Sequence, residues 1–396
     1  MRICYIASLI ELPYRDGYGS GGATHTIEVA RHLSALGHDV TVVCTRRSGE
    51  LMTEKLADFT IVRMFSWDSP LFRAVSQRSP AWAVKLLRGL IVPFVLFRTL
   101  VHLGHLTGLA AFRNFDVFYE RTSRFTNAGA LVSMLFRKPL LVEVNDEQWD
   151  DLSLRRSHAI VTPAGCMIPE CYRTKVRELN WGVNADLFQP CWQTSAVRKE
   201  LGIPCGPVVI FVGSGMEWHG LQYILDAAPL TLERYPECRF VIVGGGPQLE
   251  GYRARVEQNG LAPSFRFTGA VAYESVPRLI AACDIALAPY TSKLGENERN
   301  LFACPMKVLE YMACGVPPIV TRLANSRCLV EDGVDGILIE EDSPAAIADA
   351  ICYLLDSPER RAALGARARE SALRHYSWAQ HCRALNELFM SARGIC

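Results

Sequence analysis

The chain has 396 residues, of which 49% are hydrophobic and 21% are charged, and this balance suits a folded globular protein. One hydrophobic core rarely grows to this length, so we expect two domains. The formal net charge is +1, which gives no overall field to attract nucleic acid and argues against a nucleic-acid partner.

The 14 cysteines show no C-x-x-C pair and no regular spacing. In a chain of this length we expect buried free thiols in a reducing compartment, and therefore a cytoplasmic protein. No cluster of ligands predicts a zinc site or another metal site. The start, MRICYIAS, lacks a basic region followed by a long apolar run, so we expect no signal peptide.

Strand-like and helical patterns alternate along the first half of the chain. A helix is predicted near Thr24–Leu36, and strands are predicted at Ile3–Ala7, Val40–Cys44, Thr60–Phe65, Val117–Tyr119, Leu140–Val144 and Ala159–Thr162. Such alternation is typical of parallel sheets with crossover helices.

The pattern restarts after Asn180, so we predict a second α/β unit. Its strands are expected at Val208–Val212, Phe240–Val243, Phe265–Thr268, Ile285–Ala288 and Pro318–Thr321, and an amphipathic helix at Trp378–Phe389 ends the chain. We therefore predict two Rossmann-like domains, 1–188 and 189–376, followed by a last segment, 377–396.

Residues 78–113 break the alternation, because they are apolar and basic and contain no acid. Arg88, Pro93 and Arg98 interrupt the apolar run, so a membrane-spanning helix is not expected. The segment is either an amphipathic element at a membrane surface or an ordinary helix pair that covers a sheet.

Glycine-rich turns follow several predicted strands. Glycines let backbone N–H groups approach phosphate, and a helix N-terminus favours negative charge. Since ligands bind beyond the carboxyl ends of parallel strands, the turns together predict a pocket for a phosphorylated nucleotide, although each alone could be structural. The candidates are Gly21 and Gly22 in GYGSGG, Gly213 and Ser214 in FVGSG, Gly245, Gly246 and Pro247 in VIVGGGP, and Gly269 in FTG.

A short helix is predicted between Pro305 and Gly315. Its first turn carries Lys307, which opposes the helix dipole, and Glu310 follows three residues later. A surface ion pair is one interpretation. A helix N-terminus that holds an anion is the other.

Taken in order, these motifs resemble the GT-B glycosyltransferases of family 4, which are retaining and use nucleotide sugars. The resemblance covers most of the chain. It is carried by GSGGATHTIEVARHLSALGHDVTVV, VFYER, LLVEVND, NWGVNADLFQP, FVGSGMEWHG, VIVGGGP, FTGAV, CDIALAPY, PMKVLEYMACGVPPIV and YSWAQHCRALNELF. It implies two Rossmann-like domains that face each other across a cleft, with the final helix crossing back to the first domain.

The resemblance also implies roles for particular residues. Glu310 would bind the ribose hydroxyls of a UDP- or GDP-linked donor, and Lys307 would face its diphosphate. Ser214 and His219 stand where the family often has Arg and Lys, so they join the glycine turns as donor-binding candidates. Glu143 and Asn145 lie in the region of the sequence where the family has its catalytic histidine. Together with Lys307 and Glu310 they are the catalytic candidates. No D-x-D tripeptide occurs, so neither a metal nor another cofactor is implied.

Departures from the family pattern keep other interpretations open. Phe302 replaces the first of the family's two glutamates, and the connection between Asp151 and His158 is short. A catalytically weak homologue that binds nucleotide sugars is therefore an alternative, as is a natural-product glycosyltransferase with a soluble acceptor. Carboxylates near Glu143 and Asp146 also suggest a hydrolase pair. A dinucleotide-dependent oxidoreductase is disfavoured, because the second strand ends in Thr45–Arg46–Arg47 without an acid.

Overall fold

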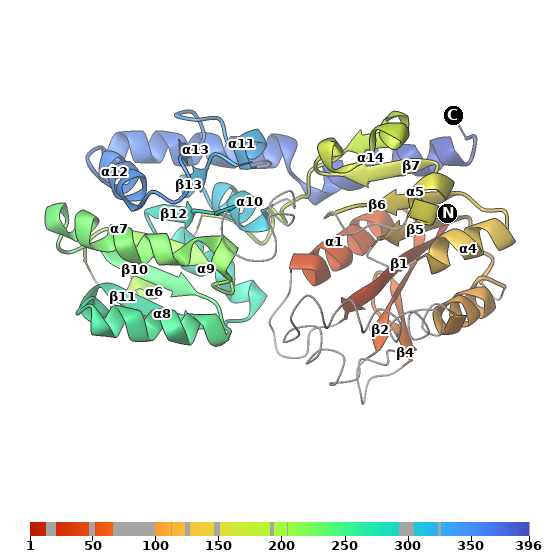
Figure 1. Ribbon diagram of the computed structural model, residues 1–396, viewed down its shortest axis with the longest axis horizontal. Coiled ribbons are helices and arrows are strands. Elements are labelled where there is room, and N and C mark those ends of the chain that lie inside the picture. Colours follow the sequence, from red (N-terminus) through yellow and green to blue (C-terminus); the bar gives the residue numbers. More distant parts are fainter. Residues whose placement is uncertain are drawn as a thin grey trace, which may run out of the picture. The chain divides into compact units, whose positions relative to one another are not determined.

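The computed structural model describes residues 1–12, 21–46, 52–65, 100–111, 113–122, 127–145, 151–190, 194–203, 205–292, 305–323 and 326–395. Its contacts divide the chain into two units (Figure 1). The first unit contains most of residues 1–179 together with the end of the chain from Cys382, and the second contains residues 180–381 together with Gly21. The contacts place the boundary after residue 179, whereas the sequence predicted it at 188/189. Residues 180–188 group with the second unit, in which Val183 pairs with Ser377.

The first unit is built on an eight-stranded sheet with the order β3-β4-β2-β1-β5-β6-β7-β8. All of its pairings are parallel except that of β3 with β4. Its strands are β1 (Arg2–Glu11), β2 (Asp39–Arg46), β3 (Thr53–Lys55), β4 (Thr60–Phe65), β5 (Val117–Arg121), β6 (Leu140–Glu143), β7 (Ala159–Thr162) and β8 (Val176–Glu178). Its helices are α1 (Gly21–Ala35), helical residues 100–111, α4 (Ala128–Leu135), α5 (Asp151–Arg156), and short 3-10 turns at Gly165–Met167 and Glu170–Lys175.

Alternation along the strands gives this sheet two apolar faces. One face packs with helical residues 100–111, α4 and α5, and its core includes Ile6, Leu106, Val132 and Leu154. The side chains of Tyr5 and Tyr119 lie on the opposite face of the sheet. The two residues are in register on β1 and β5, and their rings stack with centroids 4.7 Å apart. Phe389, in the C-terminal part of the last helix, α14 (Trp378–Ala392), packs edge-on against Tyr119.

The second unit has a six-stranded parallel sheet with the order β11-β10-β9-β12-β13-β14. Its strands are β9 (Val208–Val212), β10 (Arg239–Val243), β11 (Phe265–Gly269), β12 (Ile285–Ala288), β13 (Pro318–Thr321) and β14 (Ile337–Ile339). Its helices are α6 (Thr194–Glu200), α7 (Leu221–Arg234), α8 (Pro247–Gln258), α9 (Val276–Ala281), α10 (Met306–Ala313), α11 (Ser326–Leu329), α12 (Pro344–Leu355) and α13 (Pro358–His375), with 3-10 turns at Glu217–His219, Ala262–Ser264 and Tyr273–Ser275.

The core of the second unit lies between the sheet and α7, α8 and α12, with Val209 and Phe211 pointing into it. Helix α10 buries Val308, Leu309 and Met312 in the same unit. The predicted α/β class with two parallel sheets is confirmed.

Two sequence predictions concern membranes. Among the residues that the structure describes, no helix combines the length and apolar character needed to cross a bilayer. Residues 78–99 lie outside that part, but helical residues 100–111 bury Leu106 and Ala110 in the first core. This portion of the predicted basic segment therefore covers a sheet.

Candidate functional site

The second unit brings its glycine turns together at the carboxyl edge of the sheet. The chain runs from β9 to β10 and β11 on one side and then returns to β12 on the other side of β9, which makes a ligand-binding switch point. Gly213 and Gly244 follow β9 and β10 with φ values of +154° and +146°. A Cβ on Gly244 would overlap the carbonyl oxygen of Gly213, so the two turns pack directly against each other.

Lys307 points into this edge from the first turn of α10. Its Nζ is buried and has no hydrogen-bond partner among the described residues. It lies 4.5 Å from the ring centroid of Phe211 and 5.2 Å from that of Tyr290. A Cβ on Gly213 would lie 2.8 Å from Nζ, so a larger residue here would displace the ammonium. An unpaired buried cation is costly, and an anionic ligand would compensate it.

His219 presents a second nitrogen to the same glycine. Its Nδ1 is buried without a partner in the described part of the chain, and a Cβ on Gly213 would lie 3.3 Å from it. Burial, with a further contribution from Lys307, holds the pKa of His219 well below its ordinary value. Burial likewise lowers the pKa of Lys307 to about 7, although Glu310 opposes this shift. An anion beside both nitrogens would favour their protonated forms.

Glu310 is 6% exposed and follows Lys307 by one helical turn. The hydroxyl of Tyr273 donates to its Oε1 at 3.1 Å. Burial raises the pKa of Glu310 to about 7, while Tyr273 and Lys307 act in the opposite direction. The carboxylate is thus oriented by one hydroxyl and suited to accept further hydroxyl donors.

The other predicted donor-binding residues lie on the same edge. Gly246 caps α8, which begins at Pro247, and a Cβ on Gly246 would lie 3.4 Å from the carbonyl oxygen of Ser214. A Cβ on Gly245 would crowd Ala270, just after Gly269. The backbone N–H of Gly213 donates to the carbonyl of Val243, and that of Gly244 donates to the carbonyl of Gly269. These two N–H groups therefore hold the ends of neighbouring strands together, and they are not available to a ligand.

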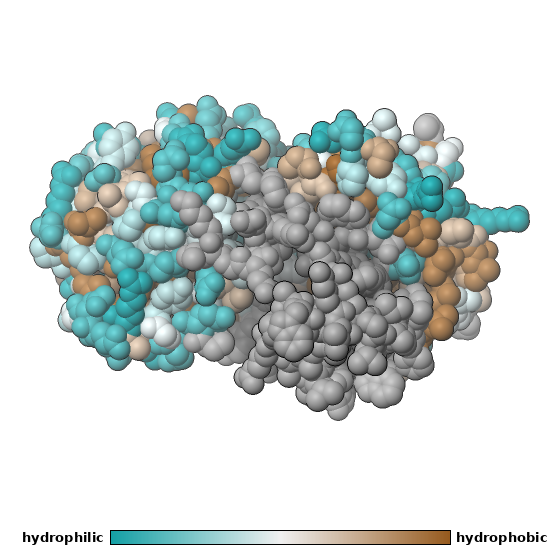
Figure 2. All heavy atoms as spheres, viewed as in Figure 1, coloured by the Kyte–Doolittle hydropathy of each residue, from teal (hydrophilic) through white to brown (hydrophobic). Residues whose placement is uncertain are grey.

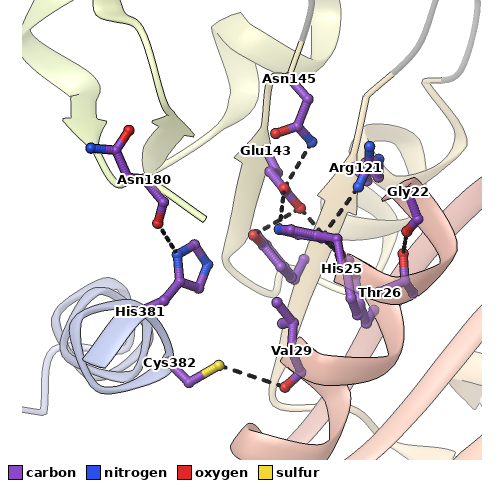
Figure 3. Close-up of polar contacts among 12 residues, drawn as sticks. Gly22, His25, Thr26, Val29, Arg121, Glu143, Asn145, Asn180, His381 and Cys382 are labelled. Carbon is purple, nitrogen blue, oxygen red and sulfur yellow. Dashed lines mark hydrogen bonds and ion pairs between the residues drawn. The ribbon is translucent and has the colours of Figure 1, made fainter. Parts of the chain in front are cut away.

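The first unit places Glu143 at the centre of a buried cluster (Figure 3). His25 Nε2 lies 3.0 Å from its Oε1, and Asn145 Nδ2 donates to the same oxygen at 2.8 Å. The hydroxyls of Tyr5 and Tyr119 donate to Oε2 at 3.2 and 3.0 Å. Burial would raise the pKa of Glu143, but His25, Arg121 and Asn145 together hold it below its ordinary range.

This geometry corrects the sequence interpretation of Glu143 and Asn145 as groups that act on substrate. Both are buried and bonded to each other, and both carboxylate oxygens of Glu143 have donors. The predicted pairing of Glu143 with Asp146 lies outside the described residues. Asp151 begins α5 and accepts the hydroxyl of Tyr172 at 2.7 Å in an exposed position.

Gly21 and Gly22 begin α1, and most of the GYGSGG turn lies outside the described residues, as does Phe302. The carbonyl of Gly22 accepts the hydroxyl of Thr26 at 2.8 Å. A Cβ on Gly22 would lie 3.4 Å from Nη2 of Arg121, at the end of β5. Sequence analysis missed Arg121, although a charged residue that ends a buried strand is a usable signal.

Solved structures with similar folds include a sucrose-phosphate synthase from Thermosynechococcus elongatus (TM-score 0.74, 17% identity, 100% of both chains). A glycosyltransferase from Rickettsia africae gives a TM-score of 0.75 at 15% identity over 99% of this chain and 98% of that one. HepE from Anabaena in complex with UDP-glucose gives 0.70 at 17% identity over 99% and 100%. The two sheets and the site at the edge of the second define a protein of the GT-B fold.

Family models match successive parts of the sequence: Glycosyltransferase Family 4 over residues 19–141 and Glycosyl transferases group 1 over residues 206–357. The chain belongs to the GT-B glycosyltransferases and is family 4-like, as its motifs predicted.

Curated relatives are similar over part of their length. A GDP-mannose-dependent alpha-(1-6)-phosphatidylinositol monomannoside mannosyltransferase from Mycolicibacterium smegmatis is 30% identical over 54% of this chain and 55% of that protein. A D-inositol 3-phosphate glycosyltransferase from Thermobispora bispora is 28% identical over 64% and 60%. The chain thus spans little more than half the length of the curated relatives it matches.

Proposed function

We propose that this protein is a glycosyltransferase that moves a sugar from a UDP- or GDP-linked donor to a hydroxyl acceptor with retention. The observation that carries the proposal is the unpartnered, buried ammonium of Lys307 beside Gly213, one helical turn from Glu310. A cation and a carboxylate at this spacing match the two polar parts of a nucleoside diphosphate, namely its phosphates and its ribose hydroxyls.

The chemistry follows from where charge develops. When the bond between sugar and phosphate breaks, negative charge accumulates on the departing diphosphate. Lys307 stabilises that charge from a fixed position, and His219 adds a second nitrogen on the same side. Glu310, held by Tyr273, accepts the ribose hydroxyls and sets the position of the phosphates. Retention follows the family, in which the leaving phosphate helps to deprotonate the acceptor on the same face of the sugar. No metal is needed in this proposal.

The relatives support a donor and an acceptor class. Their names describe a GDP-mannose-dependent enzyme that acts on a phosphatidylinositol mannoside and a glycosyltransferase that acts on inositol phosphate. HepE, which shares the fold, was solved with UDP-glucose. A role in the synthesis of a mannosyl or inositol glycolipid in the cytoplasm therefore fits best, and a soluble natural-product acceptor is the alternative.

The test is a transfer assay with purified protein, a panel of UDP- and GDP-sugars, and phosphatidylinositol or inositol phosphate as acceptor. Lys307→Met and Glu310→Gln should each lower kcat/KM at least about 100-fold, because each removes a charged contact to the donor. Lys199→Met, an exposed residue on α6, is the matched control and should leave the rate unchanged. Near-normal transfer in both site variants would refute the proposed site.

The assay also separates the competing functions. A catalytically weak homologue would bind nucleotide sugars, and so gain thermal stability, without turnover on any acceptor. An oxidoreductase would bind NAD(P) in preference to nucleotide sugars.

We also propose that the first unit contacts a membrane surface, where a glycolipid acceptor would lie. Leu100, Met134 and Leu135 are 64%, 48% and 62% exposed. Apolar side chains are visible over α4 and helical residues 100–111 in Figure 2, and Arg137 and Lys138 follow α4. Apolar and basic groups together suit an anionic bilayer. Flotation with vesicles of phosphatidylglycerol should retain the protein, and Leu135→Ser with Met134→Ser should release it.

A further inference from the structure

Strands β9 and β12 are neighbours in the second sheet, but their pairing with each other ends before the strands do. The last pair in their register joins Ile210 with Ala286. Strand β9 stays paired with β10 as far as Val212, and β12 stays paired with β13 as far as Ala288. The two strands therefore part from each other at the carboxyl edge, which is the edge of the proposed donor site.

The side chain of Tyr311 enters between the two strands at this point. Continued in the same register, a parallel ladder would join the N–H of Val212 to the carbonyl of Leu287. Instead, the N–H of Val212 donates to the hydroxyl oxygen of Tyr311 at 2.8 Å, and that hydroxyl donates to the carbonyl of Leu287 at 3.3 Å. The hydroxyl thus takes the place of one ladder hydrogen bond and satisfies both backbone groups.

Tyr311 is suited to this position because it is fully buried and keeps its proton. Burial raises the pKa of Tyr311 well above its ordinary value, so the hydroxyl both accepts and donates at physiological pH. Helix α10, which carries this residue, lies beside β12 (Figure 1). The two hydrogen bonds therefore tie the helix to both strands.

The ends of the same two strands flank the ammonium of Lys307. Lys307 precedes Tyr311 by four residues, so the two side chains share one face of α10. The Nζ atom of Lys307 lies 4.5 Å from the ring centroid of Phe211, on β9, and 5.2 Å from that of Tyr290, just after β12. The ammonium thus contacts one aromatic ring from each side of the separation that Tyr311 maintains.

We propose that Tyr311 is a positioning residue for the donor phosphates. Its hydroxyl keeps the ends of β9 and β12 apart and fixes α10 at the depth at which Lys307 reaches Gly213. The inference rests on the proposed function for the identity of the anion that Lys307 binds.

The consequence of losing the hydroxyl follows from the ladder. The N–H of Val212 and the carbonyl of Leu287 would then bond to each other, because buried backbone groups must be paired. The strand ends would close, and the rings of Phe211 and Tyr290 would push the ammonium away from Gly213.

The test is a calorimetric titration of full-length protein with UDP. Tyr311→Phe keeps the ring and removes only the hydroxyl, and UDP affinity should fall at least about tenfold, because Lys307 no longer meets the phosphates from its fixed position. Tyr235→Phe is the matched control, because it removes a hydroxyl that donates to Asp356 at the end of α7, and it should leave UDP affinity unchanged. Wild-type affinity in Tyr311→Phe would overturn the proposal.

A double-mutant cycle distinguishes positioning from a general loss of structure. In the Lys307→Met background, Tyr311→Phe should change UDP affinity by less than about twofold, because the cation through which Tyr311 acts is already absent. A loss by the same factor with and without Lys307 would mean that Tyr311 supports the fold as a whole, and it would refute the positioning role.

NMR tests the inference without a donor. In the wild-type protein, a nuclear Overhauser effect should join the amide proton of Val212 to the ring protons of Tyr311, and its absence would refute the insertion of the hydroxyl. In Tyr311→Phe, the pKa of Lys307 should rise, because a displaced ammonium meets more water, and an unchanged pKa would refute the positioning role. If both results are as expected but the protein binds neither UDP nor GDP, the proposed function alone fails.

Discussion

Burial lowers the pKa of the base Lys307 to about 7 and raises the pKa of the acid Glu310 to about 7. Above pH of about 7 Lys307 loses its proton, and with it the cation that we propose faces the phosphates. Below about 7 Glu310 gains a proton and would no longer accept ribose hydroxyls as a carboxylate. We therefore expect UDP affinity to peak near pH 7 and to fall on both sides.

Calorimetric titration with UDP at acid, neutral and alkaline pH measures this profile. Glu310→Gln should remove the acid limb, because an amide does not titrate, and Lys307→Arg should remove the alkaline limb. A flat profile in the wild-type protein would contradict the assignment of both groups to the donor.

Tyr273 orients Glu310 through a single hydrogen bond. Tyr273→Phe keeps the ring, which packs 5.4 Å from Phe188 between centroids, and removes only the hydroxyl. We expect UDP affinity to fall about tenfold to a hundredfold, the worth of one hydrogen bond to a charged group. The acid limb of the pH profile should also move upward, because Tyr273 lowers the pKa of Glu310. If the Tyr273 hydroxyl acts through ribose recognition, UDP analogues with deoxyribose should bind the wild-type protein and Tyr273→Phe equally well.

At this scale the sequence locates some groups better than others for physical reasons. Lys307 and Glu310 share one short helix, so the sequence alone places them one turn apart, and the resemblance implies the roles that we propose for them. Glu143 is different, because its partners come from β1, α1 and β5, and nothing local reveals that Tyr5, His25 and Tyr119 converge on it. A carboxylate at a strand end looks catalytic until its donors are known.

Among the elements, long buried strands were predicted well and short ones were missed. The predicted runs at 60–65, 159–162, 208–212, 285–288 and 318–321 coincide with β4, β7, β9, β12 and β13, since continuous apolar runs between turns are a strong signal. Strands β3, β8 and β14 have three residues each and little pattern to detect. Helix α10 begins at Met306 with Pro305 as its cap, one residue later than predicted, which still leaves Lys307 in the first turn.

The turn after β9 gives a prediction at the scale of elements. Gly213→Ala would force a Cβ to within 2.8 Å of Lys307 Nζ at a φ of +154°. The ammonium must move, so UDP affinity should fall at least about tenfold. Gly260→Ala is the matched control, because Gly260 also has a positive φ (+70°) but has nothing within 4 Å. It should cost about 1–2 kcal/mol of stability and leave UDP affinity near the wild-type value. If the two variants bind UDP equally, the close approach of Lys307 to this turn is not functional.

At the scale of the whole chain, the last helix belongs to two units, since the division falls between His381 and Cys382 within α14. The sequence pattern predicted an amphipathic helix here, and the resemblance to the family implied its return to the first domain. In the first unit the helix buries Phe389 completely, edge-on to Tyr119 with ring centroids 5.6 Å apart. Tyr119 in turn donates to Glu143, so the helix supports the buried cluster.

Phe389→Ala should therefore destabilise the first unit by about 3–5 kcal/mol, the usual cost of a cavity of this size. A ligand stabilises the unit that binds it, so UDP should raise the unfolding temperature of the second unit, where its proposed site lies. The loss of stability in Phe389→Ala should appear in the other thermal transition, which UDP does not shift. Leu373→Ala, on the exposed side of α13, is a control with little expected effect. A single transition that falls as a whole would mean that the units unfold cooperatively, and an unchanged profile would mean that the end of α14 does not stabilise the first unit.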